Sequence, residues 1–97
     1  MKSVFISCNQ ALYVEVQQQL EKLEIKGYTA WEENIGCGML DGEPHLGTTV
    51  WPTMNSTILT IIEEDKFQPL MSALKAIDTA NPQLGLRAFW WEVGGTL

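Results

Sequence analysis

Four side chains that could bind a metal lie close together near the middle of the sequence. They are Cys37, Asp41, Glu43 and His45. Thiolate, carboxylate and imidazole groups are the usual sulfur, oxygen and nitrogen ligands of transition metals, which makes Cys37, Glu43 and His45 candidate metal ligands. The spacing contains no paired C-x-x-C motif, and a loop histidine is more often a hydrogen-bonding or exposed residue. Both interpretations of His45 therefore stay open.

The segment that carries these side chains, residues 36–52, is rich in glycine. It holds Gly36, Gly38, Gly42 and Gly47. Glycine turns can hold a small anion through backbone N–H groups. They also allow a loop to populate two conformations, which a ligand with unequal affinities reweights. We predict that residues 37–50 become ordered when a ligand binds near Gly36, Gly38 and Arg87.

Three further charged residues are candidates for chemistry outside this segment. Glu32 and Glu33 are adjacent acids, but consecutive strand residues point to opposite faces, so we predict that they do not converge on one substrate. Arg87 follows Gly85 and could clamp a phosphate or carboxylate between subunits, or form a salt bridge with one of the 12 acids. No Ser/His/Asp set and no cofactor motif is present, which disfavours an enzyme.

Composition narrows the class of protein. The 97 residues are the length of one domain, 1–97, and 45% of them are hydrophobic, which is typical of a globular fold. A net charge of −6 without a basic cluster disfavours nucleic acid as a partner. We expect no membrane insertion, because no apolar run reaches the length of a membrane helix. The N-terminus resembles a strand rather than a signal peptide, and the two cysteines favour a reducing cytoplasm.

Apolar residues at helical spacing predict two helices. Leu12, Val16, Leu20 and Leu23 recur at intervals of four, four and three, which predicts a helix over residues 10–26. We expect Asn9 to cap its start and Gly27 its end. A second helix is predicted with Asp65 as its N-cap and with its end near Ala80.

Four strands are predicted over residues 2–8, 28–35, 53–63 and 84–93. The resulting βαββαβ order predicts an α+β, ferredoxin-like fold, with a four-stranded antiparallel sheet and both helices on one face. The long loop falls between the second and third strands. The other face should carry large residues from the strands that hold Trp31 and Phe89-Trp90-Trp91. Because uncovered apolar faces usually meet another subunit, we expect an oligomer.

This order and several motifs resemble the PII signalling protein superfamily. Gly27-Tyr28-Thr29 and Gly36-Cys37-Gly38 are similar to the PII pattern that ends in a glycine-x-glycine at the base of the T-loop. Residues 42–52 resemble a run in small PII-like bacterial proteins, and Trp90-Trp91-Glu92 resembles the related CutA branch. The sequence departs from the PII pattern at Met39-Leu40, where the family has Arg-Gln, and at residues 84–87, where it has Gly-Asp-Gly-Lys.

The resemblance implies a homotrimer with a role in signalling and nitrogen regulation. Ligands of PII proteins, adenine nucleotides among them, bind in clefts between subunits. The T-loop of these proteins engages a partner protein, and this loop corresponds here to residues 36–52. The candidate ligand-binding residues are Gly36, Gly38, Gly42, Glu43, His45, Gly47 and Arg87. The alternatives are a CutA-like metal-binding protein, with Cys37, Glu43 and His45 as ligands, and a small ferredoxin-like enzyme.

Overall fold

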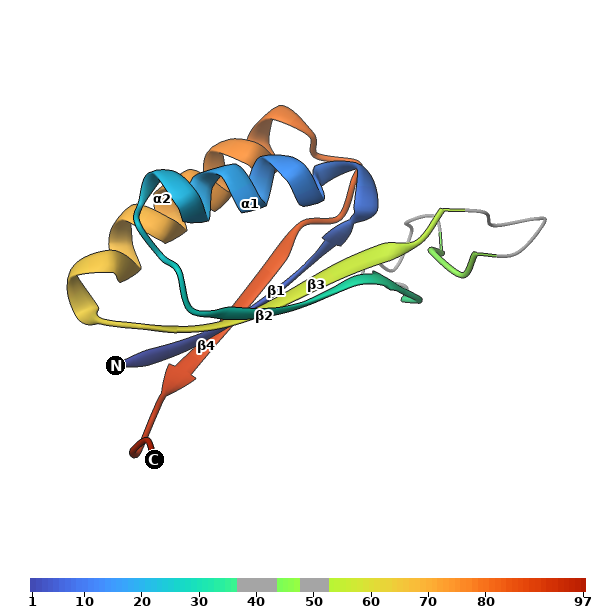
Figure 1. Cartoon of the computed structure of the whole chain (residues 1–97). Helices are drawn as coiled ribbons and strands as arrows, with labels where there is room; N and C mark the ends of the chain where they lie inside the picture. Colours follow the sequence, from blue (N-terminus) through green and yellow to red (C-terminus); the bar gives the residue numbers. More distant parts are fainter. Residues whose placement is uncertain (37–43, 48–52) are drawn as a thin grey trace.

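The computed structural model describes residues 1–36, 44–47 and 53–97. Within these residues, four antiparallel strands form one sheet in the order β2-β3-β1-β4, with two α-helices packed on it (Figure 1). The strands are β1 (Lys2–Asn9), β2 (Tyr28–Asn34), β3 (Asn55–Ile62) and β4 (Arg87–Glu92). The helices are α1 (Tyr13–Lys22) and α2 (Glu64–Ala80). The predicted ferredoxin-like βαββαβ order is confirmed.

The first helical segment begins as predicted but is shorter than predicted. Residues Gln10–Leu12 form a 3-10 turn, η1, and α1 follows it directly. Asn9 caps the turn, because its Oδ1 accepts a hydrogen bond from the Ala11 N–H at 2.8 Å. The cap thus connects β1 to α1 at one end of the sheet.

The end of α1 corrects the prediction that Gly27 is the C-cap. The Ile25 N–H donates to the Leu20 carbonyl at 2.8 Å, and the Glu24 N–H donates to the Glu21 carbonyl at 3.0 Å. This is the Schellman pattern, in which one residue takes a left-handed conformation. Here that residue is Glu24, with φ of 58°. Burial of the Ile25 side chain favours an early helix end, and Gly27 lies beyond it.

The start of α2 corrects the prediction that Asp65 is its N-cap. The helix begins at Glu64, and Glu63 occupies the cap position without a side-chain hydrogen bond to the helix. Asp65 lies in the first turn instead, where its negative charge still interacts favourably with the helix dipole.

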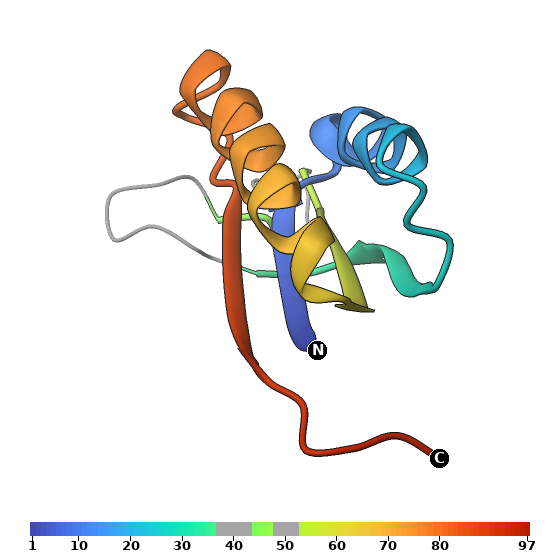
Figure 2. The ribbon, with the colours of Figure 1, turned by 90° about the vertical axis from the view of Figure 1, so that its left-hand side faces the viewer.

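One face of the sheet packs against both helices, as Figures 1 and 2 show. The core between the layers is apolar, because β1 and β3 send alternate side chains towards the apolar stripes of the helices. Its least exposed large side chains are Val4, Ile6, Val16, Leu20, Ile58 and Leu70. This layer holds the ends of the strands in fixed positions around the segment that follows β2.

No helix or strand of the described residues covers the opposite face of the sheet, which carries large apolar side chains. Trp31, Ile61, Phe89 and Trp91 are between 48% and 59% exposed. Register places Trp91 opposite Ser3 and Phe89 opposite Phe5 on this face. Trp90 does not lie on this face, because it pairs with the buried Val4 and packs edge-on against Phe67 of α2. Alternation along β4 therefore places Trp90 on the helical side.

Candidate functional site

A single antiparallel bridge closes the base of the segment between β2 and β3. The Gly36 N–H donates to the His45 carbonyl at 2.8 Å, and the His45 N–H donates to the Gly36 carbonyl at 2.6 Å. Both residues were predicted ligand-binding residues, and the structure brings their backbones together. Only Ile35 separates Gly36 from the end of β2, so the bridge lies just past the last residue of that strand.

Asn55, the first residue of β3, connects to both partners of this bridge. His45 Nδ1 lies 2.5 Å from Asn55 Oδ1. A Cβ atom placed on Gly36 would lie only 2.3 Å from Asn55 Nδ2, so no side chain fits there without moving the amide. The sequence analysis did not select Asn55. Its position at the start of a strand carried no motif that could have identified it.

Gly47 belongs to the same loop base. Its N–H donates to the Thr53 carbonyl at 3.2 Å, and its φ of 65° lies in the left-handed region that favours glycine. Met54, which follows Thr53 in the chain, accepts a hydrogen bond at its backbone carbonyl from the Gln10 N–H at 3.0 Å. These contacts attach the described part of the loop to β3 and, through β3, to the start of η1.

Arg87 begins β4, three residues later than the predicted start of that strand at residue 84, and is half exposed. Its Nη1 atom donates to the Leu86 carbonyl at 2.7 Å and lies 4.0 Å from an Asp78 carboxylate oxygen on α2. An ion pair this long and this accessible to water contributes little to stability. The guanidinium is therefore accessible to a ligand or to a second subunit.

Gly36 and Arg87 lie at the same end of the sheet but on opposite edges. β2 and β4 are the edge strands, with β3 and β1 between them. Three inter-strand spacings separate the edges by roughly 14 Å. Within one chain, the structure does not bring these two predicted ligand-binding residues together.

Five of the residues singled out from the sequence lie outside the residues that the structure describes. They are Cys37, Gly38, Asp41, Gly42 and Glu43. Among the described residues, no group of three or more His, Cys, Asp or Glu side chains could hold a metal ion. The metal site at Cys37, Glu43 and His45 and the ordering of residues 37–50 stay predictions.

A β-bulge near the end of β2 changes the expected geometry of Glu32 and Glu33. Trp31 pairs with Thr57 and Asn34 pairs with Asn55, so two residues of β2 lie opposite the single residue Ser56. The strict alternation on which the prediction for the two acids rested is therefore interrupted here, and both residues line one cleft on the helical side of the sheet. An extra residue breaks strict alternation of side chains along a strand.

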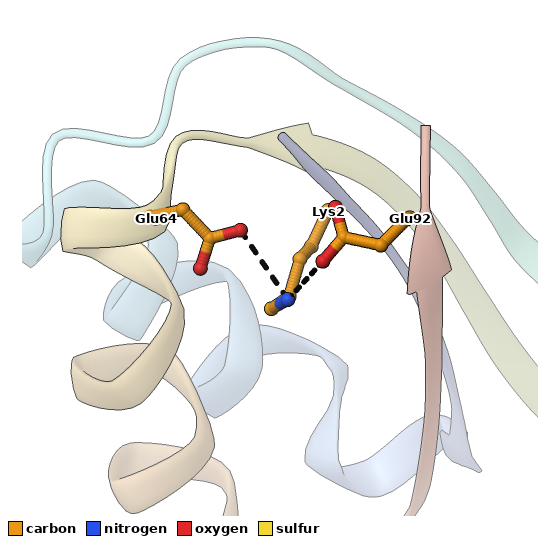
Figure 3. Close-up of polar contacts among 3 residues, drawn as sticks. All are labelled: Lys2, Glu64 and Glu92. Carbon is orange, nitrogen blue, oxygen red and sulfur yellow. Dashed lines mark hydrogen bonds and ion pairs between the residues drawn. The ribbon is translucent and has the colours of Figure 1, made fainter. Parts of the chain in front are cut away.

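The opposite end of the sheet holds a lysine between two acids (Figure 3). Lys2 Nζ lies 3.3 Å from Glu64 of α2 and hydrogen-bonds Glu92 of β4. The hydrogen bond from Lys2 lowers the pKa of Glu92, and the same bond is the main reason that the pKa of Lys2 is raised. The ammonium group also lies 5.3 Å from the centre of the Phe67 ring.

Solved structures with this arrangement of elements include PII-like proteins. A PII-like signalling protein of Thermus thermophilus has a TM-score of 0.68 and 22% identity, over 95% of this chain and 85% of that one. CPII, a nitrogen regulatory PII-like protein of Thiomonas intermedia solved with ADP, AMP and bicarbonate, has a TM-score of 0.72 and 19% identity, over 97% of this chain and 88% of that one. The same protein bound to ADP and bicarbonate has a TM-score of 0.71 and 19% identity, with the same coverage.

Sequence comparison finds neither a matching family model nor a matching curated protein. In the described part of the chain, no helix has the length and apolar character needed to cross a membrane. The similarity to known proteins is thus one of structure, and it extends over nearly the whole chain. This chain has the fold of the PII-like signalling proteins.

Proposed function

We propose that residues 1–97 form one PII-like regulatory domain and that three copies assemble into a cytoplasmic trimer. The trimer binds a small ligand in the clefts between its subunits. Ligand binding changes the conformation of the loop at residues 36–52, and this loop engages a regulated partner protein. The domain acts as a regulator and not as an enzyme.

The observation that carries this proposal is the uncovered face of the sheet. A site between subunits requires a subunit interface, and four large apolar side chains on this face, each about half exposed, are suited to one. Trp31, Phe89 and Trp91 supply aromatic surface from both edge strands. Aromatic residues are enriched at interfaces because they bury large apolar areas.

The edge positions of Gly36 and Arg87 also support a site between subunits. Roughly three strand spacings, about 14 Å, separate the two residues in one chain, which is too far for one small anion to contact both. A neighbouring copy can supply the missing partner. In this arrangement Arg87 holds a phosphate or carboxylate, and backbone N–H groups near Gly36, Gly38, Gly42 and Gly47 complete the site with Glu43 and His45.

The ligands bound to CPII define the first compounds to test. Light scattering should give about three times the chain mass of 10.9 kDa. ADP, AMP and bicarbonate, alone and in pairs, should then be added in a thermal-shift assay, since a ligand that binds only the folded state raises the melting temperature. A monomer at micromolar concentration, or no shift with any of these compounds, would count against the proposal.

A variant pair assigns the site. Arg87→Gln should raise the dissociation constant of whichever anion binds in the thermal-shift assay at least about tenfold, because the substitution removes one charge-assisted contact. Lys22→Gln, on the exposed surface at the end of α1, removes the same charge at the other end of the sheet and should leave binding unchanged. An equal loss in both variants would mean that only net charge matters.

Metal binding is a second candidate, favoured by the contact between His45 and Asn55. Metal-bound histidines usually donate their second ring N–H to an acceptor, and Asn55 Oδ1 can accept from Nδ1 at 2.5 Å. The ligand atom would then be Nε2. Calorimetry with Zn²⁺ should show binding that weakens below about pH 6. If His45→Ala binds Zn²⁺ as tightly as the wild type, His45 is not a ligand.

A further inference from the structure

We infer that a cleft between η1, the start of α1 and the end of β2 is a second ligand site, for a small organic cation that carries a guanidinium or ammonium group. The cleft is formed within a single chain and on the helical side of the sheet. It therefore differs from the proposed sites between subunits and does not depend on the trimer. In Figure 1, η1 and the start of α1 lie in the helical layer at the same end of the molecule as the end of β2 and the start of β3.

The cleft has the size and lining of a small-molecule site. Its volume is about 540 Å³. Ligand pockets commonly enclose about 300–1,000 Å³ and combine apolar walls with a few polar groups. Ala11, Tyr13 and Val14 supply apolar surface on the helical side. Glu32 and Glu33 supply polar residues on the side of the sheet, and the buried Ser56 lies beneath them.

The bulge in β2 is the feature that places both Glu32 and Glu33 in the lining of this cleft. Regular alternation would place one of Glu32 and Glu33 on the open face of the sheet. With the extra residue opposite Ser56, both contribute to the cleft. Ser56 is fully buried, and its hydroxyl donates to the Glu32 carbonyl at 2.5 Å, which holds the bulge in place. Bulges frequently redirect side chains beside binding sites.

The charge of the cleft favours a cation. Both glutamates are exposed, and no Lys, Arg or His side chain is among the described residues that line the cleft. Burial, together with the nearby Tyr28 and Glu32, raises the pKa of Tyr13. The phenol is therefore protonated at neutral pH and adds no negative charge. The net charge of −6 also attracts cations to the molecule.

The shape of the cleft favours an organic cation over a metal ion. A calcium ion takes six to eight oxygen ligands at short distances, and two glutamates on an open cleft supply few of these. A guanidinium group instead forms paired hydrogen bonds with a carboxylate, and an alkyl chain attached to it can contact Ala11 and Val14.

The first experiment compares n-butylguanidinium with n-butylurea, a neutral molecule of nearly the same shape. Each is titrated into the full chain while backbone amides are followed by NMR. Butylguanidinium should shift the amides of Ala11, Glu32, Glu33 and Ser56 with saturation at a dissociation constant near or below about 1 mM. Butylurea should bind at least about tenfold more weakly. Equal binding of the two compounds, or no saturation with either, would overturn the proposal.

Variants then locate the binding site. Glu32→Gln/Glu33→Gln should weaken butylguanidinium binding at least about tenfold, and Val14→Trp should weaken it by filling the cleft without a change of charge. Glu21→Gln/Glu63→Gln removes two exposed carboxylates elsewhere and should retain full affinity. All substituted side chains are exposed, so the fold should persist, which the amide spectra report directly. If the Glu21/Glu63 control loses as much affinity as the Glu32/Glu33 variant, the binding is not local to the cleft and the proposal is refuted. If CaCl₂ binds more tightly than butylguanidinium and shifts the same amides, the cleft is a metal site instead.

Discussion

The two ends of the sheet both present a pair of glutamates, but their surroundings differ. At one end, Glu64 and Glu92 flank Lys2, so the chain supplies its own cation (Figure 3). At the other end, Glu32 and Glu33 line a cleft that contains no basic side chain among its described residues. The first pair has a structural role, because Lys2 bonds both carboxylates and neutralises part of their charge. The second pair leaves negative charge available to a ligand.

The two ends of the sheet also differ in side-chain packing, which is closed at the Lys2 end and leaves a cleft at the other end. Around Lys2, the Phe67 ring is 6% exposed and its centre lies 5.2 Å from that of Trp90, which closes the surface between α2 and β4. Around Glu32 and Glu33, the bulge and the 3-10 turn separate α1 from β2 and leave a cleft. A well-packed end stabilises the fold, whereas an end with a cleft has surface left for binding.

The largest expected effect comes from removing the aromatic packing at the Lys2 end. Phe67→Ala should lower the free energy of unfolding by about 3–5 kcal/mol, because it creates a cavity in the core. Urea denaturation measures this change. Phe89→Ala, on the open face and 59% exposed, is the control and should cost far less when the unfolding of monomers is measured. Similar losses for both variants would show that the two faces of the sheet are not packed differently.

A smaller effect is expected at the loop base. Gly36→Ala places a Cβ atom 2.3 Å from Asn55 Nδ2, so the amide must move and its contact with His45 Nδ1 is disturbed. We expect a loss of about 1–3 kcal/mol, typical of overpacking. The matched control is Gly27→Ala, where the added Cβ meets nothing within 4 Å. If Gly36→Ala unfolds at the same urea concentration as Gly27→Ala, the described loop base adds no stability.

The smallest effect concerns the dependence of stability on pH at the Lys2 end. The hydrogen bond from Lys2 lowers the pKa of Glu92 below its usual value of 4.5. Its stabilising contribution is therefore complete above pH 4.5 and is lost as the pH falls through the lowered pKa. Wild type and Glu92→Gln should differ in urea midpoint near neutral pH and converge in acid.

Two controls accompany this measurement. The pKa of Lys2 is raised above 10.5, so the same ion pair should persist up to that pH and weaken only as the pH rises through the raised pKa. Added salt should reduce the difference near neutral pH, because exposed charges are screened. A difference that is unchanged by acid and by salt would show that Glu92 acts through packing rather than charge.

Much of the fold could be predicted because its signals are local. Leu12, Val16 and Leu20 recur at helical spacing, and all three are buried against the sheet. The apolar centre of β3 identified a strand, and the positions of the helices between strands limited the topology to a ferredoxin-like order. The role of Asn9 as a cap also depends only on neighbouring residues.

The candidate site was less predictable because it depends on pairs of residues distant in sequence. Glycine spacing identified the loop, but the bridge between Gly36 and His45 at its base appears only in the structure. The contact of His45 with Asn55 joins two segments ten residues apart and has no sequence signature. The distance between Gly36 and Arg87 follows from the order of strands in the sheet, which local patterns do not reveal.

The sequence by itself determined the elements, their order and one apolar face for each helix, because these depend on the periodicity of nearby side chains. Tertiary structure alone decided on which face of the sheet a side chain lies where a bulge interrupts alternation, and which strand residues pack against a helix. Trp90 packs on Phe67 because register with β1 places it opposite Val4. Glu32 and Glu33 share a cleft because the pairing of β2 with β3 contains one extra residue. Strand pairing is a long-range interaction. A shift of one residue in the register of two strands moves a side chain to the other face of the sheet, and no local sequence pattern indicates that shift.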